Sequence, residues 1–186
     1  AFVTDLYANK ISVLDLKSLS ITKTIPIKGW TEGIGALNQS VYVCASKEDS
    51  LHVIDANSQS KVQSYYIPHS PNQVFKQEDT LWLSCSGNAE RKINPAIYRV
   101  IENQVPEKIK EFASLDTIPY DLVFSEHTQS YFIMSNNKVY QAQLGDLRNW
   151  TLLIDFKGRN MYNLSVLDSN MFVSDAKDFQ QRGSLE

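Results

Sequence analysis

The sequence predicts an all-β protein, a β-propeller built from four-stranded antiparallel blades, on the strength of three observations. Five short runs place an aromatic residue second and an aliphatic residue third, and their starts are 40, 40, 50 and 40 residues apart. Four strand-like segments recur in one order within each repeat, and no segment shows helical periodicity. Four short strands per repeat of roughly 40 residues are typical of a propeller blade.

The aromatic runs come first in each repeat and are expected to be buried strands. Their shared position is filled by Phe2, Tyr42, Trp82, Phe132 and Phe172. A two-sheet sandwich gives no reason to keep such a pair in register through five units, and a solenoid normally has shorter repeats with fewer strands. This aromatic ladder is therefore predicted to form the core between blades.

Three more strands follow each aromatic run. The second strands begin at Lys10, Leu51, Ile97 and Lys138, the third at Ile21, Lys61, Lys108 and Thr151, and the fourth at Gly33, Gln73, Tyr120 and Asn163. In the first of the third strands, isoleucines alternate with threonines, which is the pattern of a half-buried strand. We expect the fourth strand to follow a short turn.

The domain prediction is a single β-propeller fragment over residues 1–186. Its units are 1–40, 41–80, 81–130, 131–170 and a partial 171–186. The chain starts at the second strand of one blade and stops after the second strand of another. Because the third unit is ten residues longer than its neighbours, residues 86–96 are predicted to be an inserted loop.

Composition narrows the class of function. The 186 residues are 42% hydrophobic, which suffices for a core, and 18 Lys and Arg oppose 21 Asp and Glu for a net charge of −3. Without a basic field, nucleic acid is not an expected partner. Cys44 and Cys85 lack metal-ligand spacing and are predicted to be buried free thiols. No apolar segment reaches the roughly 18 residues that span a bilayer.

Two stretches carry a resemblance to a known family. The run FVTDLYANKISVLDLKSLSITKTIPI and its second copy, VYVCASKEDSLHVID, resemble the YVTN-type repeat of surface β-propellers. The resemblance is weak at residues 86–96. Pro71 and Pro119 match the turn proline of the family, whereas Thr31 and Met161 depart from it. Members usually have seven blades, so the resemblance implies that the chain holds about four blades of a seven-bladed ring. An incomplete ring exposes strand edges, which favours self-association.

Candidate ligand-binding residues lie in loops expected on one rim of the propeller, where a rigid scaffold leaves the loop sequence free. These loops combine aromatic rings with amide and charged groups, which suits a large, partly apolar ligand with a polar edge. The predicted set is Tyr7, Trp30, Glu32, Asn72, Tyr120, Asp121, Arg159, Asn160, Tyr162, Asp175, Phe179 and Arg182. The alternative for each residue is structural, because loop tips are polar in any propeller and Asp175 can cap a turn or pair with Arg182.

An enzyme is the less favoured interpretation, and no catalytic residue, metal or cofactor is predicted. No Ser-His-Asp order or glycine-rich phosphate loop is present, and only His69 among the three histidines falls on the expected rim. Propeller lactonases hold a metal with carboxylate and Asn ligands, which Glu32, Asn72, Asp121 and Asn163 could imitate. These four are expected at differing depths.

A second resemblance concerns function. The run FVSDAKDFQQRGSL is similar to the closing region of YVTN-type propeller lipoproteins on the cell surface of Gram-negative anaerobes. Some members capture cobalamin for an outer-membrane transporter. The resemblance implies a non-enzymatic outer-membrane surface lipoprotein that captures a ligand such as a corrinoid, or docks onto such a transporter. A protein-interaction scaffold and, behind it, a metal-dependent hydrolase are the alternatives.

Overall fold

The computed structural model describes residues 1–176 and 184–185, whose strands form five antiparallel sheets in chain order. The first sheet has three strands and the second has four, with a short 3-10 helix after β5. Their bounds are β1 (Phe2–Asp5), β2 (Lys10–Asp15), β3 (Ser20–Pro26), β4 (Thr31–Leu37), β5 (Ser40–Ala45), η1 (Ser46–Glu48), β6 (Ser50–Asp55) and β7 (Ser60–Tyr66).

Two more four-stranded sheets and a three-stranded sheet complete the described chain. Their strands are β8 (Pro71–Gln77), β9 (Thr80–Cys85), β10 (Ala96–Val100), β11 (Glu107–Glu111), β12 (Leu122–Ser125), β13 (Ser130–Ser135), β14 (Lys138–Gln143), β15 (Thr151–Asp155), β16 (Met161–Leu167), β17 (Asn170–Asp175) and β18 (Ser184–Leu185). Every strand expected from the repeat is present. We call the sheets blades 1 to 5.

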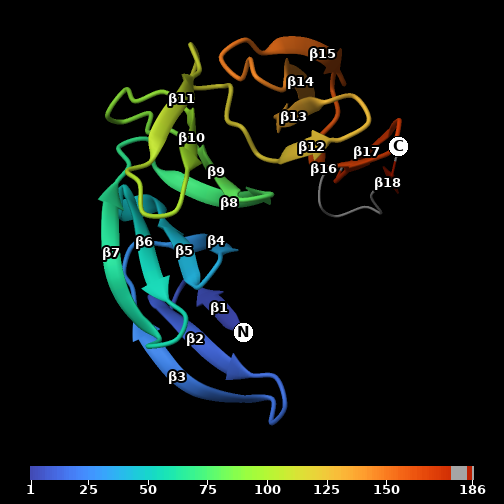
Figure 1. The fold of residues 1–186 in the computed structure, drawn as a ribbon. Helices are drawn as coiled ribbons and strands as arrows, with labels where there is room; N and C mark the ends of the chain where they lie inside the picture. The colour runs from blue at the N-terminus through green and yellow to red at the C-terminus, as the bar shows by residue number, and fades with distance from the viewer. Residues whose placement is uncertain (177–183, 186) are drawn as a thin grey trace.

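The blades follow one another along an arc, with β4, β8, β12 and β16 on its concave side (Figure 1). We call these four the inner strands. Each is the last predicted strand of one repeat unit and pairs with the aromatic strand of the next, so the blades are offset from the sequence units by one strand.

Both faces of each central blade are buried, which explains the nearly continuous apolar runs. Along β5, Tyr42 and Cys44 pack against blade 3, whereas Val41 and Val43 pack against blade 1. Successive residues of a strand point to opposite faces, so a strand buried on both sides needs apolar residues at every position. Cys44 and Cys85 are buried and free, as predicted, and burial raises the pKa of both thiols.

The aromatic ladder is core in the middle of the arc only. Tyr42, Trp82 and Phe132 are at most 5% exposed and each belongs to a cluster shared by two blades. Phe2 and Phe172 are half-buried. They lie in blades 1 and 5, which each contact a neighbour on one side in the described structure.

The inserted loop of the third repeat joins β9 to β10. Asn88 and Ile93 form a small bridge, and Arg91 makes a bidentate ion pair with the buried Asp49 of blade 2, with Nη2 2.7 Å from Oδ1. The loop therefore packs on the neighbouring blade.

Candidate functional site

A β-bulge recurs where the inner strands begin. The register with the aromatic strand shifts by one residue at Asn72 in β8, at Tyr162 in β16, and at Glu32 and Gly33 in β4. A bulge leaves one extra residue without a partner across the strand pair and re-aims side chains locally.

The start of β12 shows the same irregularity. Met134 accepts a hydrogen bond from the backbone N–H of Tyr120 (2.7 Å) and donates one to the carbonyl oxygen of Asp121 (3.1 Å). Two successive residues thus pair with one, before Leu122 resumes the regular register opposite Ile133.

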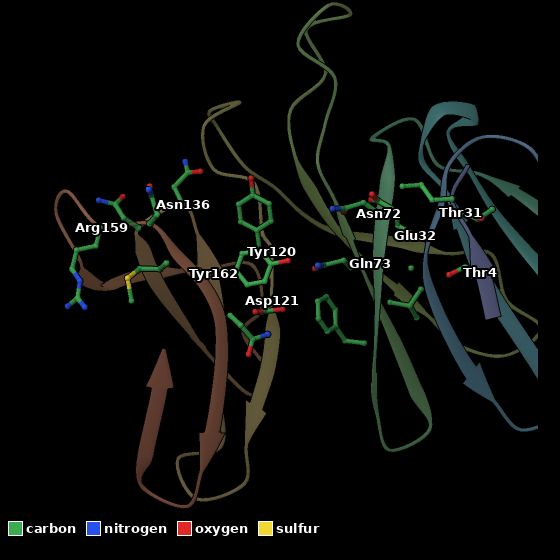
Figure 2. Close-up of a pocket in the computed structure, with 18 of the residues that line it drawn as sticks. Thr4, Thr31, Glu32, Asn72, Gln73, Tyr120, Asp121, Asn136, Arg159 and Tyr162 are labelled. Atoms are coloured by element: carbon green, nitrogen blue, oxygen red, sulfur yellow. The ribbon is translucent and has the colours of Figure 1, made fainter. Parts of the chain in front are cut away.

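The bulges bring two successive residues of each of β4, β8 and β16, and the two residues directly before β12, to one cavity of about 1340 Å³. At equivalent positions, the first tier holds Glu32, Asn72, Tyr120 and Tyr162, and the second tier holds Gly33, Gln73, Asp121 and Asn163. Figure 2 shows Gln73 on one side of this cavity and Tyr120 and Asp121 on the other. Five of the predicted binding residues are therefore brought together by the inner strands.

Arg159 and Asn160, also predicted, line the same cavity from the turn before β16. Arg159 Nε donates to Asp175 Oδ2 at 3.0 Å, and the side chain of Asp175 is 7% exposed. Asp175 thus lies behind the cavity and holds Arg159. Asp175 is not among the residues that line the cavity, which differs from the expectation that it faces the ligand. The alternative pairing of Asp175 with Arg182 falls outside the described residues.

Asp121 connects two inner strands. Its Oδ2 accepts a hydrogen bond of 2.9 Å from the backbone N–H of Leu164 in β16. Burial raises the pKa of the Asp121 carboxyl above its ordinary value, while the bond from Leu164 acts in the opposite direction. The carboxyl is thus held at the wall of the cavity.

Three predicted residues of the described structure do not line the cavity, and two more lie outside the described residues. Tyr7 is 84% exposed in the β1–β2 loop. Trp30 is 40% exposed before β4, with Lys47 Nζ 3.7 Å from its ring centroid. Asp175 lies behind the cavity, as described, and Phe179 is outside the described residues, as is Arg182.

Sequence reasoning missed several residues of the cavity. Gln73, Asn136 and Asn137 line it and were not in the predicted set. Aligning the inner strands position by position would have found Gln73, which is equivalent to Asp121. Asn72 Oδ1 and Gln73 Oε1 are buried without a hydrogen-bond partner in the described structure.

The histidines lie elsewhere. His69, expected on the rim, is 5% exposed, and its Nδ1 lies 2.7 Å from the carbonyl oxygen of Asn94. Burial lowers the pKa of His52, whose Nδ1 contacts Ser64 Oγ at 2.8 Å. Within the part of the chain that the structure describes, no three His, Cys, Asp or Glu side chains form a group that could hold a metal ion.

The four residues that could imitate the metal ligands of a propeller lactonase do not occupy equivalent positions of the inner strands. Glu32 and Asn72 belong to the first tier, and Asp121 and Asn163 to the second.

The fold and the concave cavity define a β-propeller of four-stranded antiparallel blades, present in part. Hydrazine synthase of Kuenenia stuttgartiensis has a similar structure, with a TM-score of 0.75 and 15% identity over 94% of this chain and 51% of that chain. A nidogen/laminin complex is similar with a TM-score of 0.70 and 14% identity, over 94% of this chain and 66% of that chain. The dihydro-heme d1 dehydrogenase NirN is similar with a TM-score of 0.68 and 10% identity, over 99% of this chain and 41% of that chain.

These similarities establish the fold, and the chain spans about half the length of the hydrazine synthase chain that it matches. No protein-family model matches the sequence. No curated protein matches it either. None of the described helices is long and apolar enough to cross a membrane.

Proposed function

We propose that the protein is a non-enzymatic β-propeller of the cell envelope that captures a ligand in the cavity of the inner strands. One observation carries the proposal: two successive residues at the start of each of four consecutive inner strands, or directly before it in the case of β12, line a single cavity. Polar side chains that converge from several strands onto one concavity are typical of a small-molecule site.

The side chains of the cavity suit a large neutral ligand. Asn72, Gln73 and Asn163 offer donors and acceptors together, and Tyr120 and Tyr162 offer ring surface. Glu32 and Asp121 disfavour an anionic ligand, and Arg159 is already paired with Asp175. Among the cavity's described lining residues there is no Ser, Cys or His to act as a nucleophile or imidazole base.

A corrinoid is the ligand to test first. The YVTN-type resemblance suggests it, and a corrin ring with amide side chains is large, flat and polar at its edge. Capture for an outer-membrane transporter, from a lipoprotein on the outer-membrane surface, belongs to the same proposal.

A protein-interaction scaffold is the second candidate, favoured by the exposed aromatic residues outside the cavity. Tyr7 and Trp30 lie on neighbouring loops, because Asn9 Oδ1 accepts a 3.3 Å hydrogen bond from the backbone N–H of Gly29. If a partner protein binds there, changes at Tyr7 should abolish its binding and leave the cavity unaffected.

Isothermal titration of the full-length protein with cobalamin and cobinamide tests the proposal. Tyr120→Ala and Asn72→Ala should each weaken binding by about tenfold or more, as expected for central contacts. Tyr66→Ala is the control, because Tyr66 is 71% exposed on the outer strand β7. Absence of binding would reject the corrinoid, and a ligand bound equally by all three variants would reject the cavity.

A further inference from the structure

The backbone of Trp30, in the loop between β3 and β4, has a left-handed conformation. Its φ is 59°, in a region where glycine and asparagine are common and a bulky aromatic residue is an outlier. Ser70, directly before β8, is equivalent, because the carbonyl oxygens of Trp30 and Ser70 accept hydrogen bonds from the backbone N–H groups of Ser46 and Ser86. Its φ is 54°, but its side chain is small and buried. Outliers of this kind cost free energy and gather at functional sites, so Trp30 is a candidate for a role in binding.

Hydrogen bonds to two neighbouring loops fix the position of Trp30. From the loop after β5, the backbone N–H of Ser46 donates to the carbonyl oxygen of Trp30 (3.3 Å), and that of Lys47 donates to the carbonyl oxygen of Gly29 (3.0 Å). From the loop after β1, Asn9 Oδ1 accepts a hydrogen bond of 3.3 Å from the backbone N–H of Gly29. The ring is therefore held on a supported loop rather than at the tip of an isolated one.

The ring of Trp30 nevertheless remains accessible to solvent. Trp30 is 40% exposed, and the Lys47 ammonium lies over one face of the ring, with Nζ 3.7 Å from the ring centroid. The other two tryptophans differ, because Trp82 is buried in the core and Trp150 is half-buried, with its Nε1 donating to the carbonyl oxygen of Leu147 at 2.9 Å. Trp30 is thus the tryptophan of this chain that a ligand can reach.

Polar side chains of three kinds surround the exposed ring. Asn9, Lys47 and Glu48 are all exposed. Glu48 packs against the loop, since a Cβ added to Gly29 would lie 2.7 Å from its Cγ. An amide both donates and accepts hydrogen bonds, an ammonium donates, and a carboxylate accepts. The charges of Lys47 and Glu48 balance, which leaves no surplus of positive charge for a phosphate and suits a neutral ligand with many hydroxyl groups.

We propose that Trp30 is the stacking platform of a carbohydrate site that takes a neutral oligosaccharide of pyranose rings with equatorial hydroxyl groups. Such a ring presents C–H bonds on its faces and hydroxyl groups at its edge. The face of Trp30 opposite Lys47 packs on the C–H bonds, and Asn9, Lys47 and Glu48 bond the hydroxyl groups. Because Trp30 does not line the cavity of the inner strands, this site is independent of the proposed function.

Cellotetraose is a suitable probe, because its β-linked glucose rings carry their hydroxyl groups equatorially. It should bind the full-length protein with a Kd below about 1 mM, measured by isothermal titration or by ligand-observed NMR. Sorbitol, which has hydroxyl groups but no ring, should not bind measurably. Trp30→Asn should weaken cellotetraose by about tenfold or more, because asparagine tolerates the left-handed backbone and lacks the ring. Trp30→Phe retains a ring and should lose less affinity than Trp30→Asn.

Leu19→Asn is the matched control. Leu19 is also large, apolar and exposed, and its φ is 53°, but it lies in the turn between β2 and β3, at the opposite end of blade 1 from Trp30. Replacing either residue by asparagine relieves the same backbone conformation. Both variants should therefore melt at the temperature of the wild type or above it, and Leu19→Asn should bind cellotetraose as the wild type does.

Three results overturn the proposal: cellotetraose that does not bind, equal affinity of the wild type and Trp30→Asn, or a Trp30→Asn variant that melts well below the wild type, which would make the ring structural. Cobalamin binding tests the proposed function separately. It should be retained in Trp30→Asn and weakened in Tyr120→Ala and Asn72→Ala, so each of the two sites can fail while the other stands.

Discussion

Two neighbouring junctions between inner strands, β4 with β8 and β8 with β12, are built in opposite ways. At the first, a Cβ added to Gly33 would lie 2.7 Å from the carbonyl oxygen of Asn72, and one added to Gly35 would collide with Cγ1 of Val74. At the second, the positions equivalent to Gly33 and Gly35 hold Asp121 and Val123, and two cavities open there, the one already described and a second of about 640 Å³. We call the junction of β4 with β8 the closed junction and that of β8 with β12 the open junction.

The difference shows that side-chain size on the inner strand helps to set how closely two blades approach. Glycine lets the backbone of β8 come close to β4, as close approach between backbones requires. The ion pair of Arg91 with Asp49 and the hydrogen bond from Asn38 to Glu102 also connect the two blades of the closed junction. The open junction instead encloses space that a ligand can use.

The largest effect is expected at the core of the open junction. Trp82 is 5% exposed and packs against blade 4, so Trp82→Ala should lower the free energy of unfolding by about 3–5 kcal/mol. Chemical denaturation measures this loss. Trp30→Ala, at a partly exposed position, should change it by no more than about 0.5 kcal/mol. An unchanged midpoint for Trp82→Ala would show that the ladder is not core.

The closed junction should be sensitive to a single methyl group. Gly33→Ala forces the added Cβ against the backbone of β8 and should cost about 1–3 kcal/mol of unfolding free energy. Ser165→Ala, at an exposed inner-strand position of β16, should be nearly neutral. If both variants have the same melting temperature, the close approach of β4 and β8 does not determine the stability of this junction.

Removing the ion pair of the closed junction should destabilise the protein less than either of these changes. Arg91→Ala removes the guanidinium partner of the buried Asp49 carboxylate, which keeps its hydrogen bond from the hydroxyl of Ser70, and should lower the melting temperature modestly. Deleting residues 88–93 should leave the fold intact and cost a similar amount, because the deletion removes Arg91 and with it the ion pair to blade 2. A deletion that yields no soluble folded protein would show that the loop is part of the fold itself.

The smallest effect is a pH dependence at the wall of the open junction. Since burial raises the pKa of Asp121, the folded chain keeps a proton that the unfolded chain has already released, and this contribution to stability is lost as the pH rises. Asp121→Asn lacks this titration. Its stability relative to the wild type should therefore increase between about pH 4 and about pH 7. A pH-independent difference in denaturation midpoints would contradict the assignment.

Much of the fold could be predicted because the signals are local. The aromatic ladder and the alternation of isoleucine and threonine in β3 depend on the two-residue period of a strand, which the chain itself displays. Tyr120, Asp121 and Tyr162 were predicted in the site because turns before inner strands reach one rim in any propeller.

The rest depends on contacts between distant residues. The pairing of Arg159 with Asp175 joins the turn before β16 to the end of β17, and no local pattern of the sequence predicts it. The burial of His69 depends in part on the inserted loop, since Asn94 supplies its partner from 25 residues away.

The sequence by itself determined the order of the strands, the apolar faces of the blades and the set of loops that carry polar side chains. Only the tertiary structure decided which of these side chains share a cavity, and that the cavity continues past Phe75 between β8 and β12. The physical reason is that periodicity fixes which face of a strand a residue occupies, whereas the bulges and the spacing of neighbouring strands arise from packing between residues far apart in the chain.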